Sequence, residues 1–150
     1  MKILIGSDHA GFELKNNLKQ FLVEKGYEVK DYGPEKFDEN DDYPKILAPV
    51  GQYIAEHPDE DVKAVILGGS GQGEAMIANR FPGVRATVYY GGNLEIIKLS
   101  QLHNNANVLA LGARFLTPEQ AREAVGLWLE TKFQGEERHQ RRNDMLDNVE

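Results

Sequence analysis

Short apolar runs alternate with longer amphipathic stretches along almost the whole chain. The runs at 2–8, 62–68 and 107–112 are nearly continuous in aliphatic residues, which is typical of strands buried on both faces. A more polar run at 27–33 predicts an edge strand, and the run at 84–90 predicts a further strand. Five strands are therefore expected.

Apolar residues at helical spacing predict helices between these strands. We expect helices over 11–26, 44–57, 93–104 and 117–133, and the start of another one in "EAMIANRF" at 74–81. Thr117, Pro118 and Gln120 have the spacing of a capping box at the start of the last of these helices. Pro49 is expected in or near the first turn of the helix over 44–57, because proline disrupts a helix interior.

Five repeats of strand and helix predict the fold class. Crossover helices between parallel strands pack on both faces of the sheet, so we expect an α/β, three-layer, doubly wound, five-stranded parallel sheet of Rossmann-like type. The chain is long enough for one domain, predicted over residues 1–150. The charged C-terminal tail lies beyond the last repeat and is expected to pack as a helix on a second copy of the chain.

Composition excludes several classes of function. The net charge of −7 argues against nucleic-acid binding. The absence of cysteine excludes disulfides, thiolate catalysis and cysteine metal sites, and no pair of histidines has metal-site spacing. The N-terminal residues do not resemble a signal peptide and no apolar run approaches transmembrane length, so we expect a cytoplasmic protein with no membrane partner.

Polar clusters follow four of the predicted strands. They are "SDH" at 7–9, "GGSGQGE" at 68–74, "YYGGN" at 89–93 and "GAR" at 112–114. Ligands of such sheets bind beyond the carboxyl ends of the strands, so these clusters mark the expected site. A further cluster, "LHNN" at 102–105, ends the helix that precedes the last strand.

The glycine loop at 68–73 matches neither common nucleotide-binding pattern. Glu74 and Met76 stand where the dinucleotide fingerprint needs glycine or alanine, and the lysine of a Walker loop is absent. The loop still presents backbone N–H groups at a helix start, which suits a phosphate or an oxyanion formed during reaction. A carboxylate such as Glu74 in the first helical turn is also explained by the helix dipole alone.

Several motifs together resemble one enzyme family. They are "GSDHAG" at 6–11, "DYP" at 42–44, "GGSGQGEAMIANRFPGVRA" at 68–86, "HNNANVLALGAR" at 103–114 and "ERHQRR" at 137–142. In this order they resemble the ribose-5-phosphate isomerase B family, which includes galactose-6-phosphate isomerase subunits and allose-6-phosphate isomerases. The resemblance implies interconversion of aldose and ketose phosphates without metal, nucleotide or other cofactor. It also implies a homodimer or homotetramer whose active sites lie between two subunits.

The resemblance implies a catalytic base other than the cysteine found in many family members. That cysteine corresponds to Gly68, and this chain resembles the branch in which the glutamate matching Glu74 takes its role. One carboxylate can carry a proton between C1 and C2 through a cis-enediolate. The N–H groups of Gly69, Gly71 and Gly73, with the Ser70 hydroxyl, would then hold the enediolate oxygen. The helix dipole lowers the pKa of Glu74 and burial raises it, and the sequence leaves that balance open.

The remaining site residues are assigned by the same resemblance. His103 matches the acid/base of ring opening, Asp8 a group that binds sugar hydroxyls and assists ring opening, and Asn104 a ligand of the enediolate or hydroxyls. The expected phosphate ligands are Arg138, Arg142, His9 and Arg114, and Tyr43 lines the pocket. Helix capping by Asp8 and surface ion pairs of the two tail arginines are structural alternatives. His57 and His139 are expected at the surface.

Two other functions fit the same residues. One is isomerisation of a six-carbon sugar phosphate, allose 6-phosphate or galactose 6-phosphate, because pocket size decides sugar length. The other is a non-catalytic sugar-phosphate sensor, since a fold alone does not establish catalysis. The presence of Asp8, Ser70, Glu74 and His103 together favours an enzyme, because a sensor needs only the phosphate ligands. The leading interpretation is interconversion of D-ribose 5-phosphate and D-ribulose 5-phosphate.

Overall fold

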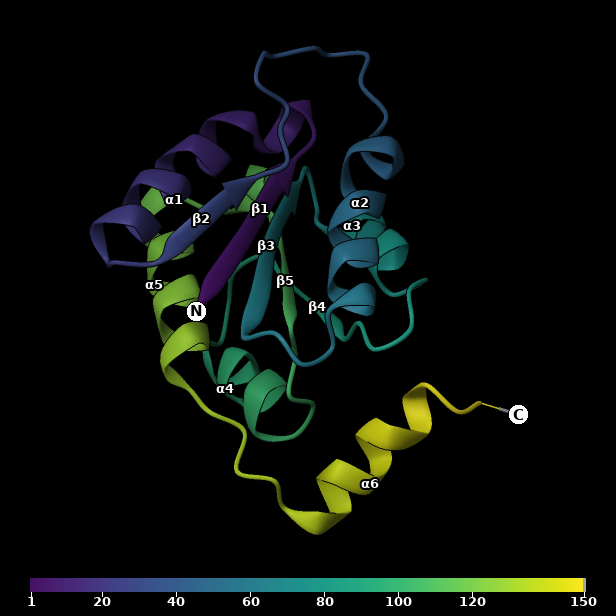
Figure 1. Ribbon diagram of the computed structural model, residues 1–150. Coiled ribbons are helices and arrows are strands. Elements are labelled where there is room, and N and C mark those ends of the chain that lie inside the picture. Colours follow the sequence, from purple (N-terminus) through teal and green to yellow (C-terminus); the bar gives the residue numbers. More distant parts are fainter. Residues whose placement is uncertain (150) are drawn as a thin grey trace.

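Five parallel strands pair in the order β2-β1-β3-β5-β4 in the computed structural model, which describes residues 1–149 (Figure 1). The strands are β1 (Lys2–Ser7), β2 (Glu28–Asp31), β3 (Val62–Gly68), β4 (Ala86–Tyr89) and β5 (Val108–Gly112). The helices are α1 (Phe12–Glu24), α2 (Tyr43–Glu56), α3 (Gln72–Ala78), α4 (Glu95–Leu102), α5 (Pro118–Glu130) and α6 (Glu137–Leu146), with short 3-10 turns η1 (His9–Gly11) and η2 (Ala113–Phe115). The predicted fold class is confirmed.

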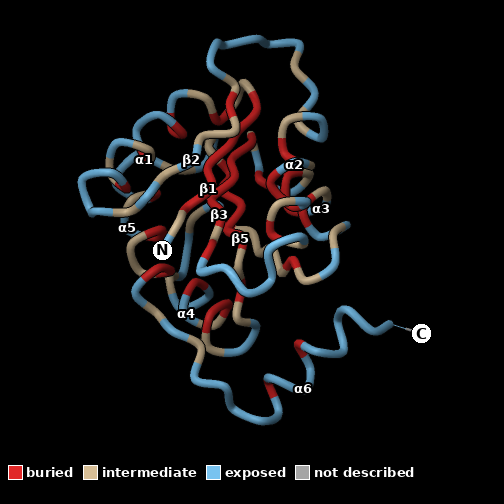
Figure 2. Tube along the Cα trace, viewed as in Figure 1, coloured by how far each residue is buried: buried red, intermediate tan, exposed pale blue. Residues whose placement is uncertain are grey.

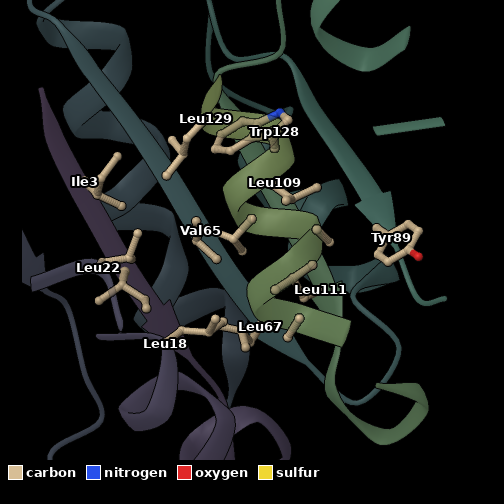
Figure 3. Packing of buried hydrophobic residues seen from close by; sticks show 14 of the residues in the cluster. Ile3, Leu18, Leu22, Val65, Leu67, Tyr89, Leu109, Leu111, Trp128 and Leu129 are labelled. Carbon is tan, nitrogen blue, oxygen red and sulfur yellow. The ribbon is translucent and has the colours of Figure 1, made fainter. Parts of the chain in front are cut away.

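Both faces of the sheet are covered, which explains why the central strands have no polar face. Successive side chains of β3 point to opposite sides: Val65 packs under α1 and α5, and Ile66 packs under α2 and α3. Figure 3 shows Trp128 and Leu129 of α5 over the first of these faces. Figure 2 shows burial concentrated in β1, β3 and β5. As predicted, the more polar β2 lies at an edge.

Helix boundaries agree with the sequence to within a few residues, and one expectation about proline is wrong. The capping box of Thr117 and Gln120 is present at the start of α5. Pro49 lies inside α2 rather than in its first turn, because that helix begins at Tyr43 and continues through the proline. Pro49 is exposed, so the carbonyl group that loses its helical donor is near solvent.

The charged tail forms α6, which lies beside α4 and away from the carboxyl ends of the strands (Figure 1). It contacts its own chain: the Asn143 side chain donates to the His103 carbonyl at 3.1 Å, and the Asp147 carboxylate accepts from the Gly83 N–H at 2.8 Å. Most of α6 is exposed (Figure 2). The tail is therefore attached to its own domain but leaves most of its surface uncovered.

Candidate functional site

The carboxyl edge of the sheet gathers one group of the predicted site residues. Strands β1 and β3 end together, since Ser7 pairs with Leu67, and β3 and β5 end together at Gly68 and Gly112. The segments that follow these strand ends bring Asp8, Ser70 and Glu74 to one edge. His9 and Arg114 follow the same strand ends within η1 and η2.

The glycine loop makes a tight turn into α3. Gly71 has φ +80° and serves as N-cap, a conformation that residues with a side chain rarely adopt. A Cβ atom on Gly71 would also lie 3.0 Å from the Leu111 backbone carbon, so the loop packs directly on the end of β5. The Ser70 hydroxyl accepts from the Gln72 N–H at 3.4 Å. This turn directs the start of α3, and with it Glu74, toward the end of β3.

Glu74 is buried, with 4% of its surface exposed, and its carboxylate fills the space that a side chain at position 68 would occupy. A Cβ atom on Gly68 would overlap both carboxylate oxygens of Glu74. Burial raises the pKa of Glu74, and the neighbouring Asp8 carboxylate raises it further. The balance left open by the sequence therefore favours a carboxyl group that is a stronger base than an exposed glutamate.

Asp8 also caps the turn that follows β1. Its side chain is 8% exposed and accepts from the Gly11 N–H at 3.1 Å, so the capping alternative is present in the structure. The remaining carboxylate oxygen is compatible with a second role toward a ligand, because one carboxylate accepts several hydrogen bonds.

Two further side chains lie directly over the glycine loop. A Cβ atom on Gly73 would come 2.5 Å from the Tyr43 hydroxyl oxygen, and one on Gly69 would come 3.1 Å from a guanidinium nitrogen of Arg114. The Arg114 N–H also donates to the Gly69 carbonyl at 3.1 Å. These glycines allow an aromatic hydroxyl and a cation to approach the loop.

His9 has a carboxylate partner that the sequence analysis did not identify. Its backbone N–H donates to Asp41 Oδ1 at 3.2 Å, and its Nδ1 lies 2.8 Å from the same oxygen. Asp41 belongs to the polar loop before α2, where four of the five residues from Asp38 to Asp42 are acidic and the fifth is an amide, so the sequence gives no signal that singles out one of them. Hydrogen bonding to Asp41 raises the pKa of His9.

The second group of predicted residues lies at the opposite edge of the sheet. His103 and Asn104 follow α4 and precede β5, and the Asn104 carbonyl accepts from Arg85 just before β4. Arg138 and Arg142 lie on α6, four residues apart as predicted for one helical face. Strand β3 has seven residues and separates the two edges by about 20 Å. One chain therefore does not bring Glu74 and His103 together.

His139 is buried, which corrects the expectation that it lies at the surface. Its ring stacks on the His103 ring with 4.3 Å between centroids, and 6% of the residue is exposed. Burial lowers the pKa of His139, and the adjacent His103 lowers it further. The surface expectation failed because the buried residues of α6 are polar while its apolar residues, Met145 and Leu146, are exposed, so hydrophobic patterning does not show which side packs.

The tail arginines remain largely in solvent. Arg138 Nε lies 3.5 Å from a Glu136 carboxylate oxygen, and this exposed pair is the surface alternative considered above. Arg142 makes no ion pair with any residue of 1–149. Within the same range, no group of three or more His, Asp or Glu side chains is arranged to hold a metal ion, and no helix is long and apolar enough to cross a bilayer.

Known proteins resemble this chain over its full length. The family described as Ribose/Galactose Isomerase matches residues 3–146. Ribose-5-phosphate isomerase B of Mycolicibacterium paratuberculosis is 37% identical over 100% of this chain and 92% of its own length. D-erythrulose-4-phosphate isomerase of Pectobacterium atrosepticum is 34% identical over 90% of this chain and 86% of its own.

A solved structure gives the same result in three dimensions. Ribose-5-phosphate isomerase B of Mycoplasma genitalium, crystallised with bound ribulose-5-phosphate, superposes with a TM-score of 0.91 at 36% identity, covering 98% of this chain and 94% of that one. The fold is therefore shared with proteins of one enzyme family.

Proposed function

Because this chain belongs to the ribose/galactose isomerase family, we propose that it interconverts D-ribose 5-phosphate and D-ribulose 5-phosphate through a cis-enediolate. The observation that carries this proposal is the buried Glu74 carboxylate, which occupies the space beside Gly68 at the glycine loop. The naming of several relatives as ribose-5-phosphate isomerase B supports the five-carbon substrate.

The carboxyl edge supplies the groups that proton transfer requires. Glu74 removes the proton from C2 of the open-chain aldose and returns it to C1, and its raised pKa makes the carboxylate a stronger base for the removal step. The N–H groups of Gly69, Gly71 and Gly73 and the Ser70 hydroxyl stabilise the enediolate oxygen. Asp8 and Tyr43 bind the sugar around this centre.

The opposite edge of the sheet, where the strands begin, is called the amino edge. It supplies groups that open the sugar ring and hold the phosphate, and these groups act on the sugar bound at the carboxyl edge of a partner subunit. His103 opens the ring, Asn104 binds the sugar hydroxyls, and Arg138 with Arg142 binds the phosphate together with His9 and Arg114. Since the two edges of one chain are about 20 Å apart, a complete site requires the amino edge of a second copy. A two-fold dimer brings two carboxyl edges and two amino edges together as two equivalent sites.

The proposal extends to the domain and its location. We assign residues 1–150 to a single isomerase domain, supported by the family match over 3–146. We place the reaction in the cytoplasm, supported by the lack of cysteine in the chain.

Turnover of a panel of sugar phosphates tests the substrate. We expect kcat/KM for ribose 5-phosphate to exceed that for allose 6-phosphate, galactose 6-phosphate and D-erythrulose 4-phosphate by about tenfold or more, since one carbon changes pocket fit by 1–3 kcal/mol. A higher value for a six-carbon substrate or for erythrulose 4-phosphate would reassign the substrate and retain the mechanism. The erythrulose compound is included because a relative of similar identity is named for it.

Solvent exchange separates an enzyme from a sugar-phosphate sensor. An isomerase that works through an enediolate incorporates deuterium from D2O at C1 or C2 of the sugar, because the carboxylate exchanges its proton with water. Tight binding of ribose 5-phosphate with neither deuterium incorporation nor formation of ribulose 5-phosphate would identify a sensor and reject the proposal.

A further inference from the structure

Asp41 is held against His9 by a loop that is fixed at both ends. Lys15, buried in α1 with 1% exposed, donates to the Pro34 carbonyl at 2.8 Å and to Asp31 at 3.0 Å, which anchors the start of the loop. The loop ends where α2 begins at Tyr43. Within the loop, the Asp41 N–H donates to the Asp38 carbonyl at 3.2 Å. The Asp41 carboxylate is therefore a fixed acceptor rather than a mobile surface charge.

The contact between Asp41 and His9 determines both the position and the charge of the imidazole. One oxygen, Asp41 Oδ1, receives the His9 backbone N–H at 3.2 Å and faces Nδ1 at 2.8 Å, so the ring is attached at two points. The ring also packs edge-on against Phe37, with 6.1 Å between centroids. With Nδ1 engaged, Nε2 is the ring nitrogen that remains available to a ligand.

The Asp41 carboxylate itself requires a positive partner. Its side chain is 9% exposed, and Oδ2 is buried without a hydrogen-bond partner among residues 1–149. An ionised carboxylate in such a place is costly unless a cation faces it. An imidazolium at His9 meets this need, so the charges of the two groups stabilise each other.

Other charges around His9 act in both directions. The Asp8 carboxylate, at the end of β1, favours the protonated ring, and the Arg114 guanidinium, from η2, disfavours it. Asp41, from the loop before α2, is the group with the largest effect and makes the pKa of His9 higher than that of an ordinary histidine. Without Asp41, the Asp8 carboxylate alone would offset the effect of the Arg114 guanidinium, which disfavours the protonated His9 ring.

We propose that Asp41 is a positioning residue that keeps His9 oriented and positively charged, so that Nε2 donates to the phosphate dianion of the substrate at neutral pH. This inference rests on the proposed function for the identity of the phosphate ester, and on the observed contacts for the role of Asp41. It adds a residue of the loop before α2 to the machinery that holds the substrate.

The first test measures His9 directly, in the full-length protein without any sugar. The ring signals of His9 are followed by NMR as the pH is raised through about 5 to 9. Asp41→Asn retains an acceptor for the backbone N–H and removes the charge, so the pKa of His9 should fall toward the ordinary histidine value. Asp38→Asn is the matched control, because Asp38 is an exposed acid of the same loop whose turn with the Asn40 N–H an asparagine also makes.

The second test measures phosphate recognition. For Asp41→Asn we expect the KM for ribose 5-phosphate and the Kd for inorganic phosphate to rise about fivefold near pH 8, with kcat changed less than twofold. The difference from the wild-type protein should shrink near pH about 6, where the histidine is protonated in both proteins. In a His9→Gln background the further change Asp41→Asn should alter neither constant, because its effect passes through the imidazole.

The outcomes separate this inference from the proposed function. A His9 titration that is the same in Asp41→Asn and the wild-type protein would overturn it, as would a KM increase equal at all pH values or one that persists in the His9→Gln background. The NMR and inorganic-phosphate measurements use no isomerase activity. They therefore decide the role of Asp41 even if the wild-type chain isomerises none of the sugar phosphates in the panel.

Discussion

The carboxyl edge of the sheet holds its two candidate carboxylates, Glu74 and Asp8, inside the fold, whereas the candidate residues of the amino edge lie at the surface. Glu74 and Asp8 are 4% and 8% exposed; the Glu74 carboxylate lies beside Gly68 at the end of β3, and the Asp8 carboxylate accepts from the Gly11 N–H. His103, Asn104, Arg138 and Arg142 are all exposed, and two of them stand on a helix that contacts the domain at only a few points.

The difference indicates separate tasks for the two edges. A base that moves a proton between carbon atoms needs a low-dielectric surrounding and a fixed position, and the sheet end provides both. Groups that bind a doubly charged phosphate can remain solvated until the substrate and a partner subunit cover them. Each prediction below tests one side of this division.

The largest effect is expected from Glu74→Gln, which removes the base and keeps the shape. Turnover should fall by about 10³-fold, while the Kd for inorganic phosphate stays within about twofold, because phosphate binding belongs to other residues. Steady-state kinetics and isothermal titration measure the two quantities. Turnover within tenfold of wild type would remove Glu74 from the mechanism.

The pH dependence of kcat/KM and of stability provides a second test of the role of Glu74. Since the pKa of Glu74 is raised, kcat/KM of the wild-type enzyme should fall with decreasing pH at a higher pH than an ordinary glutamate would give. Between the ordinary glutamate pKa and the raised one, Glu74 is protonated in the folded protein and ionised in the unfolded protein. The free energy of unfolding of the wild-type protein, relative to that of Glu74→Gln, should therefore decrease as the pH rises through this range. If the free energy of unfolding depended on pH in the same way in the wild-type protein and in Glu74→Gln, the raised pKa of Glu74 would be contradicted.

The next prediction uses the absence of a side chain at position 68. In Gly68→Ala the new methyl group would overlap the Glu74 carboxylate. The carboxylate must therefore move, and it is free to do so because it is the flexible end of a side chain. Displacing a catalytic group by about 1 Å costs about 10²-fold in turnover. We therefore expect a large loss of turnover with only a small change in the free energy of unfolding.

Gly126→Ala is the matched glycine variant. Gly126 lies within α5, and the nearest atom to a new methyl group would be 4.0 Å away. This variant should raise the free energy of unfolding by about 0.5–1 kcal/mol and leave turnover unchanged.

Full activity in Gly68→Ala would show that the Glu74 position seen here is not the catalytic one.

His103→Ala tests the exposed edge and its partner subunit together. Turnover of cyclic ribose 5-phosphate should fall by about 10²-fold, and that of an open-chain analogue should fall much less, because only the former needs ring opening. Equal losses on the two substrates would remove the ring-opening role.

Mixing inactive variants then decides where each residue acts. After subunits of Glu74→Gln and His103→Ala exchange at random, half of the dimers contain one of each. Each such dimer has one site with both native residues, so about a quarter of wild-type activity should return. A mixture that stays inactive after exchange, shown by mass spectrometry of the mixed dimer, would place both residues in one subunit's site.

The sequence was more informative about the buried edge than about the exposed one. Strand runs such as 62–68 and the glycines after them are constrained by packing, so the fold and the position of Glu74 followed from the pattern. The pairing of His9 with Asp41 could not be predicted, because several acidic residues of one irregular loop are equivalent in sequence.

Burial on the tail helix was equally hidden from the sequence. His139 and Asn143 are the buried residues of α6, and both are polar, so the usual apolar stripe is missing. The stack of His139 on His103 depends on how α6 docks beside α4, which is a tertiary contact with no local signal. The resemblance to a family placed Arg138 and Arg142 in the site but did not show that they stand about a strand's length from Glu74.

The smallest predicted effect comes from neighbouring arginines of α6 that differ in their partners. Arg141 donates to both carboxylate oxygens of Glu137 at 3.0 and 2.9 Å, whereas Arg142 has no ion pair within residues 1–149 and shares a helical face with Arg138. Arg142→Ala should raise the KM for ribose 5-phosphate about tenfold, and Arg141→Ala should change it less than twofold, because only the unpaired guanidinium is available to the phosphate. Raising ionic strength should reduce the difference, since the phosphate contact is made by an exposed charge. Equal KM values for the two variants would mean that this face of α6 does not reach the substrate, and the exposed edge would then lose its phosphate-binding role.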